Sequence, residues 1–381
     1  MKILLVGGSF DNDGGRESGL VKKLHKALKN IENVSTEIYN GGYYKSLEEI
    51  LSSTINYDVV FWMANVPNDY PKIRDVKEVA PHVMLVSSKR NDNDKYPFKE
   101  LVERTLAMKA NLTLEFKKME SGIFNIMVFD PLGSVWYEGQ NINNAVLAVI
   151  NRLSFLMSIT RKATIKSEDN VNLKLNWYFD RFKLDEKKAD GIVESIISDE
   201  YLDLITEYAK VFQNIMGVNN KSVETAKMSP PQVFRCSKGM PSFRSGNLVV
   251  VSKRAVFTQF LTKEDFVATY MENGELFYYG DDKPSVDTPN HIKLYENLKN
   301  INFIIHSHNY IDGAPFTNVA IPCGAIEESD EVIKAIKESY GSLDGNRYMI
   351  NLKGHGSFLL GSSIDDLKGA NYIGRSLPER M

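Results

Sequence analysis

The chain has 381 residues, 43% hydrophobic and 25% charged, which predicts a folded protein too long for a single core of typical size. Its net charge of −3 argues against a nucleic-acid-binding protein, which would usually gather a basic excess on one face. The first residues hold too short an apolar run for a signal peptide, and no later run reaches the roughly 18 apolar residues of a membrane span. We therefore expect a cytoplasmic protein without nucleic-acid or membrane partners. Its two cysteines, Cys236 and Cys323, are too few for a disulfide framework.

Residues 1–160 alternate short apolar runs with helical patterns, as a parallel sheet with crossover helices requires. The expected strands cover residues 2–6, 34–39, 58–64, 82–87, 112–116 and 124–129. The expected helices cover residues 18–29, 46–53, 98–110 and 143–159. The pattern predicts a flavodoxin-like or Rossmann-like α/β domain with a doubly wound, mainly parallel sheet. A charged linker with bridging helices is expected to follow at residues 161–196.

A glycine-rich loop, GGSFDNDGGRESG, joins the first expected strand to the first helix at residues 7–19. Ligands bind at this position in open α/β sheets, because free backbone N–H groups and the helix dipole attract anions. The residues that could bind a phosphate or nucleotide are Gly14, Gly15, Arg16 and Ser18. The loop matches neither of the usual nucleotide-binding motifs, and Asp11 and Asp13 would oppose an anion. A surface loop that needs glycines only for its turns is the alternative interpretation.

The second half of the chain has an α+β pattern, which we assign to a domain at residues 197–381. The expected helices cover residues 201–216, 288–298 and 329–339. The expected strands cover residues 248–252, 255–260, 276–279, 301–305, 348–352 and 357–360. Residues 235–244 are basic and contain glycine and proline, so we expect a solvated loop there, with contact to an anionic substrate as the alternative.

The apolar run at residues 301–305 leads into His306-Ser307-His308. Because residues two apart share one face of a strand, both imidazoles would project together from its end. His355 lies between two glycines in the turn of the last strand pair, where the backbone can approach a ligand closely. A catalytic zinc takes three protein ligands and keeps a fourth position open. Most chance His-x-His pairs are surface or core histidines, so the spacing alone does not decide for a metal site, and His291 is expected to be a packed or capping histidine.

Four segments resemble, in order, motifs of the class II aldolase/adducin family. SGNL at residues 245–248 is similar to its Gly-Asn-x-Ser segment, and KPSVDTPNH at 283–291 to its Pro-Ser-Ser-Glu-x-x-x-His segment. FIIHSH at residues 303–308 resembles its Val-Val-His-x-His strand, and GHGSFLLG at 354–361 its Asn-His-Gly segment. The resemblance implies a central, mainly antiparallel sheet flanked by helices, usually assembled as a cyclic tetramer.

The resemblance also implies site residues. The metal ligands, normally of zinc, would be His306, His308 and His355. Asp287 stands where the family has a proton-shuttling glutamate, and Asn247 and Ser285 stand where it holds the substrate phosphate. A divalent ion that stabilises an enediolate, beside a carboxylate that moves a proton, serves cleavage, epimerisation and dehydration alike. The expected function is a metal-dependent lyase of the aldolase type, or a related epimerase or dehydratase, acting on a sugar or sugar phosphate.

The sequence departs from the family pattern at several points. Asp287 is one methylene shorter than glutamate, which matters where catalytic geometry must hold to about 1 Å. Val286 replaces a serine of the phosphate pocket, and the segment between His308 and His355 is shorter than usual for the family. Two alternatives therefore stay open: a non-catalytic aldolase/adducin-like binding or assembly protein, and a nucleotide-ligand binder acting through the N-terminal domain.

Overall fold

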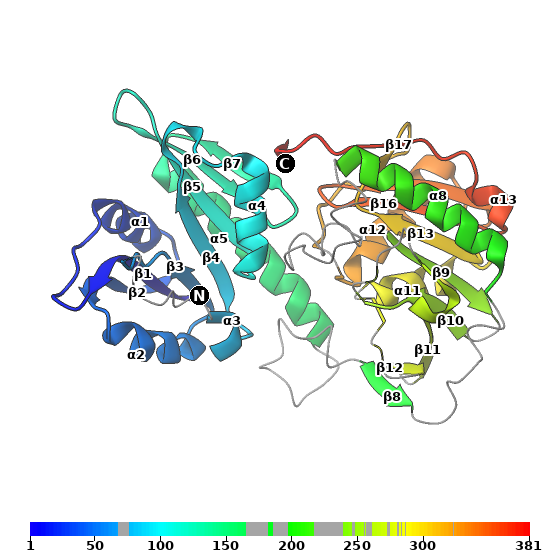
Figure 1. The fold of residues 1–381 in the computed structure, drawn as a ribbon, viewed down its shortest axis with the longest axis horizontal. Helices are drawn as coiled ribbons and strands as arrows, with labels where there is room; N and C mark the ends of the chain where they lie inside the picture. Colours follow the sequence, from blue (N-terminus) through cyan, green and yellow to red (C-terminus); the bar gives the residue numbers. More distant parts are fainter. Residues whose placement is uncertain are drawn as a thin grey trace. The chain divides into compact units, whose positions relative to one another are not determined.

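The computed structural model divides into two compact units (Figure 1), Met1–Asn176 with Leu377–Met381, and Trp177–Ser376. The residues that the structure describes are 1–67, 76–164, 182–185, 197–216, 239–245, 248–254, 256, 261–272, 275–279, 282, 284–285, 287–322 and 324–381. Most of the expected linker at residues 161–196 and most of the expected strand at 255–260 lie outside them. The division between the units falls within that expected linker, and the last five residues of the chain pack with the first unit.

The first unit contains a mainly parallel sheet with the strand order β18-β7-β6-β5-β4-β3-β1-β2. Its strands are β1 (Lys2–Asp11), β2 (Ser35–Tyr43), β3 (Val59–Trp62), β4 (Met84–Arg90), β5 (Leu112–Lys118), β6 (Phe124–Phe129), β7 (Ser134–Gly139) and β18 (Glu379–Arg380). Strands β1 to β5 pair in parallel, whereas β6 and β7 add an antiparallel extension and β18 pairs in parallel with β7. The predicted fold class of this domain is confirmed, although β7 and β18 were not predicted.

Helices cover both faces of this sheet because successive strand residues point to opposite faces. The helices of the unit are α1 (Gly19–Lys29), α2 (Ser46–Ser53), α3 (Val76–Val79), α4 (Phe98–Ala107) and α5 (Ile142–Thr164), with 3-10 turns η1 (Thr54–Asn56) and η2 (Asp92–Asp94). Ile3 and Leu5 pack in the core that α1 and α5 complete. Leu4 and Val6 face the opposite core, which α2 completes.

Helix α5 is the one described helix that could cross a membrane by length and composition, with a mean hydropathy of 1.4 over Ile142–Ile159. We expected no such segment from the sequence. Its buried residues Val146, Val149 and Leu153 lie in the same core cluster as the strand residues of the sheet. A buried stripe at this spacing is typical of a core helix.

The second unit contains a mainly antiparallel sheet with the strand order β15-β16-β13-β9-β10-β11-β12-β8. Its strands are β8 (Phe182–Asp185), β9 (Gly239–Ser245), β10 (Leu248–Ser252), β11 (Phe266–Glu272), β12 (Glu275–Tyr279), β13 (Phe303–Ser307), β15 (Arg347–Leu352) and β16 (Gly356–Gly361). Only the β8–β12 pair among them is parallel. The expected antiparallel sheet is confirmed, and β8, β9 and β11 are additions that the sequence patterns did not predict.

The sheet of the second unit has a different set of helices on each face. The remaining elements are α8 (Asp199–Met216), α11 (Thr288–Asn297), α12 (Glu327–Tyr340), α13 (Ile364–Leu367), the 3-10 turn η4 (Lys263–Asp265), and the strand pair β14 (Tyr310–Ile311) and β17 (Tyr372–Ile373). Ile304 packs in the core cluster that contains buried residues of α11 and α12, whereas Ile305 packs in the cluster that contains those of α8. Because residues 304 and 306 share a face, His306 belongs to the face covered by α11 and α12.

Candidate metal centre

Three imidazoles converge at the end of β13. The ring centroids of His306 and His355 lie 4.8 Å apart, those of His308 and His355 4.9 Å, and those of His306 and His308 5.3 Å. One nitrogen from each residue lies within 4.8 Å of the other two, and this is the one such group found among the described residues. The structure thus brings together the three predicted metal ligands, two from one strand end and one from a distant hairpin.

His306 is fixed by the strand beside it. Strand β16 pairs with β13 so that His306 lies opposite Phe358 and Ser307 opposite Ser357. The carbonyl oxygen of Ser357 lies 3.0 Å from Nδ1 of His306. Because a carbonyl only accepts, Nδ1 carries the hydrogen and Nε2 carries the lone pair. This Nε2 atom is buried and has no hydrogen-bond partner among the described residues.

His355 reaches the same point because its hairpin lies very close to β13. A Cβ atom on Gly356 would lie 1.9 Å from the carbonyl oxygen of Ser307, so only glycine allows this approach. Gly354 adopts a φ of 70°, and its N–H donates to the hydroxyl of Tyr310 at 3.1 Å. The two glycines around His355 therefore have different functions, one in forming the turn and the other in admitting the neighbouring strand.

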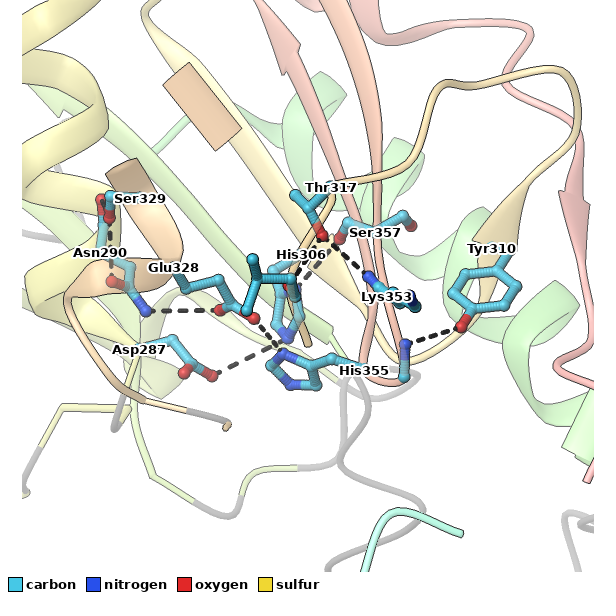
Figure 2. Close-up of polar contacts among 12 residues, drawn as sticks. Asp287, Asn290, His306, Tyr310, Thr317, Glu328, Ser329, Lys353, His355 and Ser357 are labelled. Carbon is cyan, nitrogen blue, oxygen red and sulfur yellow. Dashed lines mark hydrogen bonds and ion pairs between the residues drawn. The ribbon is translucent and has the colours of Figure 1, made fainter. Parts of the chain in front are cut away.

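A buried carboxylate orients His355. Oε1 of Glu328, near the start of α12, lies 2.6 Å from Nδ1 of His355 (Figure 2). The pair is sealed from solvent, with the Glu328 side chain 2% exposed and that of His355 0%. Acceptance of the Nδ1 hydrogen by a carboxylate leaves Nε2 as the coordinating nitrogen, an arrangement common among metal-ligating histidines. The sequence analysis missed Glu328, since acidic residues in the first turn of a helix are usually exposed to solvent and interact favourably with the helix dipole.

Asp287 also lies beside the histidines. It is the residue before α11, it is buried, and it makes no side-chain capping hydrogen bond to that helix. Its Oδ2 atom lies 3.9 Å from Nε2 of His306. Figure 2 shows the side chains of Asp287 and Glu328 directed toward His306 and His355. The predicted proton-transfer residue therefore reaches the histidine cluster in spite of its short side chain.

Burial sets the electrostatics of the cluster. Burial lowers the pKa of His306, and neighbouring His355 lowers it further, which favours the neutral imidazole needed by a metal ligand. Burial and nearby Asp287 raise the pKa of Glu328 well above its usual value. A divalent cation would oppose this rise, because its charge stabilises carboxylates around it. Three nitrogens in a compact group, two buried carboxylates and the orphaned Nε2 of His306 fit such a cation.

His291 has a structural position, as the sequence analysis expected. Its Nδ1 lies 2.6 Å from Oγ of Ser242, and its ring packs on Phe358 with centroids 5.3 Å apart. Burial lowers the pKa of His291 well below its usual value. It is not part of the ligand group found among the described residues.

The predicted phosphate-binding residues are only partly described. Ser285 is half-buried, and its N–H donates to the carbonyl oxygen of Ser252 at 3.2 Å. This bond positions Ser285 at the approach to α11, two residues before Asp287. Asn247 lies outside the described residues. Their role in holding a phosphate stays a prediction.

The basic segment before Asn247 is not a solvated loop where the structure describes it. Residues 239–245 form β9, which pairs with both β10 and β13. Arg244 donates through Nε to Oδ1 of Asn302 at 2.9 Å and through Nη1 to the carbonyl oxygen of Tyr295 at 3.3 Å. It also donates to the carbonyl oxygen of Lys299. Arg244 therefore binds acceptors in the last turn of α11 and in the segment between α11 and β13, and Lys238 lies outside the described residues.

The glycine-rich loop lies in the first unit, and much of its backbone is hydrogen-bonded internally. The N–H groups donate from Gly15 to the carbonyl oxygen of Gly42 at 2.8 Å, from Arg16 to Oγ of Ser9 at 2.6 Å, and from Ser18 to Oδ1 of Asn40 at 2.8 Å. A Cβ on Gly15 would lie 1.8 Å from the carbonyl oxygen of Ser9. These contacts give the loop a structural reason for its glycines, and phosphate binding through Gly14, Gly15, Arg16 and Ser18 stays a prediction.

Comparison with known proteins adds an independent result for the second unit. The family described as Class II Aldolase and Adducin N-terminal domain matches residues 226–314, which include Asp287, His306 and His308. The L-fuculose phosphate aldolase of Methanococcus maripaludis strain DSM 14266 is 28% identical over 151 residues, which cover 34% of this chain and 76% of the relative.

Two solved structures are similar to parts of the chain. An L-fuculose 1-phosphate aldolase is 17% identical, with a TM-score of 0.31, and covers 47% of this chain and 84% of its own. The DNA/pantothenate metabolism flavoprotein from Streptococcus pneumoniae is 12% identical, with a TM-score of 0.33, and covers 41% of this chain and 99% of its own. The mainly parallel sheet of the first unit is that of a flavodoxin/Rossmann-like domain. The family match over residues 226–314, the sequence relative and the ordered motifs together identify a class II aldolase/adducin domain in the C-terminal region of this chain.

Proposed function

We propose that the second unit is a divalent-metal-dependent lyase of the aldolase type that acts on a sugar phosphate. One observation carries the proposal: three imidazoles converge within 4.8 Å, beside the buried carboxylates of Asp287 and Glu328. A purely structural core has little reason to gather four buried ionisable groups beside the half-buried His308, because each buried group costs desolvation energy. Zinc is the proposed ion, since three histidines with an open fourth position are a frequent catalytic zinc set.

Each group has a proposed part in the chemistry. His306, His308 and His355 hold the ion, which when bound would supply Lewis-acid polarisation of a substrate oxygen. Oδ2 of Asp287, 3.9 Å from Nε2 of His306, is the proposed proton acceptor and donor. The same arrangement serves cleavage of a carbon–carbon bond and the related epimerisation and dehydration, so the choice among them depends on the substrate. Cleavage is preferred because the curated relative named above is an L-fuculose phosphate aldolase.

Substrate binding and assembly extend the proposal. Asn247 and Ser285 are proposed to hold the substrate phosphate, from their positions in the family motifs. We also propose a cytoplasmic homo-oligomer, in keeping with the tetramers that the resemblance implies. A non-catalytic binding or assembly role is disfavoured by the complete ligand group, since such a role would not require three converging histidines.

Metal analysis tests the proposal first. We expect about one divalent ion per chain by elemental mass spectrometry of the purified protein, and loss of that ion in the double variant His306→Ala/His308→Ala. Phosphorylated and free ketoses would then be screened for cleavage. Absence of metal from the wild-type protein, even after reconstitution with zinc, would reject the lyase and leave the binding or assembly role in its place.

A further inference from the structure

Glu328 belongs to a buried hydrogen-bond network that extends away from the histidines. Its Oε1 accepts the Nδ1 hydrogen of His355 at 2.6 Å, and its Oε2 lies 3.5 Å from Nδ2 of Asn290. The hydroxyl of Ser329 donates to Oδ1 of Asn290 at 2.9 Å. This bond directs the Nδ2 group of Asn290 toward Glu328, because the amide's oxygen and nitrogen lie on opposite sides (Figure 2).

All residues of this hydrogen-bond network are buried. Asn290, Ser329 and His355 are 0% exposed, and Glu328 is 2% exposed. Polar groups at this depth are costly unless each has a partner, and hydrogen bonds between them are stronger than in water. The hydrogen-bond network therefore restricts each of these side chains to one orientation.

The hydrogen-bond network also links the two helices whose first turns border the histidine cluster. Asn290 lies on α11 three residues after Asp287, so both residues are on the same side of that helix. Glu328 and Ser329 lie in the first turn of α12. A contact between Asn290 and Glu328 thus connects the helix that carries the proposed proton-transfer carboxylate to the residue that orients His355.

We propose that Glu328 and Asn290 are positioning residues of the metal centre. Glu328 fixes the tautomer and the direction of the His355 ring so that Nε2 is the coordinating atom, and Asn290 holds Glu328 in register with Asp287. The inference rests on the proposed function and deepens it, since it assigns residues that no sequence motif identified. Neither residue is proposed to touch the substrate.

A merely structural Glu–His pair makes a different prediction. It would lower the stability of the protein when removed but leave the metal affinity of the folded protein unchanged. A positioning pair changes metal affinity even where the fold is intact, typically by 10- to 100-fold. Metal affinity therefore separates the two roles.

The test compares four variants of the full chain with the wild-type protein. Zinc dissociation constants would be measured by competition with a chromophoric chelator, and circular dichroism would show that each variant is folded. We expect about 10- to 100-fold weaker binding in Glu328→Ala and a smaller loss in Glu328→Gln, whose amide oxygen still accepts from Nδ1. Asn290→Ala should also lose less than Glu328→Ala, since it removes only the support of Glu328. The control Asp330→Ala removes an exposed first-turn carboxylate of α12 that pairs with Lys293, and it should bind zinc as the wild type does.

Substitution by cobalt gives a second readout, because its visible spectrum reports ligand geometry. A shifted spectrum in Glu328→Gln would support the positioning role. If Glu328→Ala does not fold, the nearly isosteric Glu328→Gln decides by the same two measurements. Wild-type zinc affinity and an unchanged cobalt spectrum in Glu328→Ala and Asn290→Ala would overturn the inference alone, and the same result in Glu328→Gln and Asn290→Ala would overturn it where Glu328→Ala does not fold. Failure of the wild-type protein to bind zinc would instead overturn the proposed function, and the inference with it.

Discussion

Oδ2 of Asp287 lies 3.9 Å from Nε2 of His306, although the two residues belong to different elements, the start of α11 and the end of β13. This distance is too long for a direct hydrogen bond and leaves the Asp287 carboxylate beside the proposed metal ligands. The proposed proton-transfer role of Asp287 requires a carboxylate near the metal ligands, and this position supplies one.

The variant Asp287→Ala should lose activity and keep its metal. Loss of a positioned acid–base group typically costs 10²- to 10⁴-fold in rate, so we expect a fall in kcat of at least about 100-fold. Steady-state kinetics with the substrate found by the ketose screen would measure it, together with metal content. Asp282→Ala is the control, since Asp282 is exposed and pairs with Lys253. An unchanged kcat in Asp287→Ala would remove Asp287 from the mechanism.

Gly356→Ala should weaken both the fold and the metal site. The added Cβ would meet the Ser307 carbonyl oxygen at 1.9 Å, which forces β16 away from β13 and moves His355 away from His306. Overpacking of this kind typically costs about 1–3 kcal/mol. Chemical denaturation and zinc competition would measure the two effects. Gly19→Ala is the control because its Cβ meets nothing within 4 Å, and equal behaviour of the two variants would contradict the close-approach argument.

Asn351→Ala should release the segment that follows the histidine pair. The Asn351 side chain accepts from the Ile311 N–H at 2.8 Å, and it donates to the carbonyl oxygens of Ile311 at 2.9 Å and Ala314 at 3.1 Å. Loss of these buried bonds leaves backbone groups unsatisfied, which costs about 1–3 kcal/mol for each such group. Faster amide hydrogen exchange around residues 311–314 would confirm the anchoring. Asn318→Ala, which removes an exposed contact to Glu338, should leave exchange there unchanged.

Lys77 should make the stability of the first unit depend on pH. Its Nζ donates to the Val83 carbonyl oxygen and to Oδ1 of Asn111, and burial lowers its pKa to about 7. Since the unfolded lysine has a pKa near 10.4, the unfolded chain binds more protons than the folded chain between these values. Folding stability from this group therefore rises with pH from about 7 to about 10 and is lowest below pH 7.

Calorimetric unfolding of Lys77→Met against the wild type would test this dependence. The difference in unfolding temperature between the two proteins should change steadily from pH 7 to pH 10, in the direction that favours the wild type at high pH. Lys109→Met, which removes an exposed lysine paired with Glu78, should show no such trend. A constant difference for Lys77→Met across this range would contradict the prediction.

Regular local patterns were predictable from the sequence. The helix α2 and the strand β6 have the predicted bounds, because their apolar spacing and flanking residues are unambiguous. Strand β9 was missed because it contains Gly239 and Pro241, and glycine and proline are rare in the middle of a sheet. Pro241 is tolerated there because β9 pairs with β10 only from Ser242 to Ser245, so Pro241 has a ladder partner on β13 alone.

The sequence by itself predicted that His306 and His308 project together from one strand end, because alternation along a strand is a local property of the backbone. Strand β13 ends at Ser307, so His308 lies just beyond the strand, yet its ring still lies beside that of His306. The sequence also placed His355 in a glycine-flanked turn. Only the tertiary structure decided that this turn lies against the end of β13, through the pairing of β16 with β13 and the close approach at Gly356. It alone revealed Glu328 as the partner of His355, because the burial of an acidic first-turn residue depends on which elements pack around it. Hydrogen bonds between distant segments fix the tautomers and directions of the His306 and His355 imidazoles, and no local pattern encodes them.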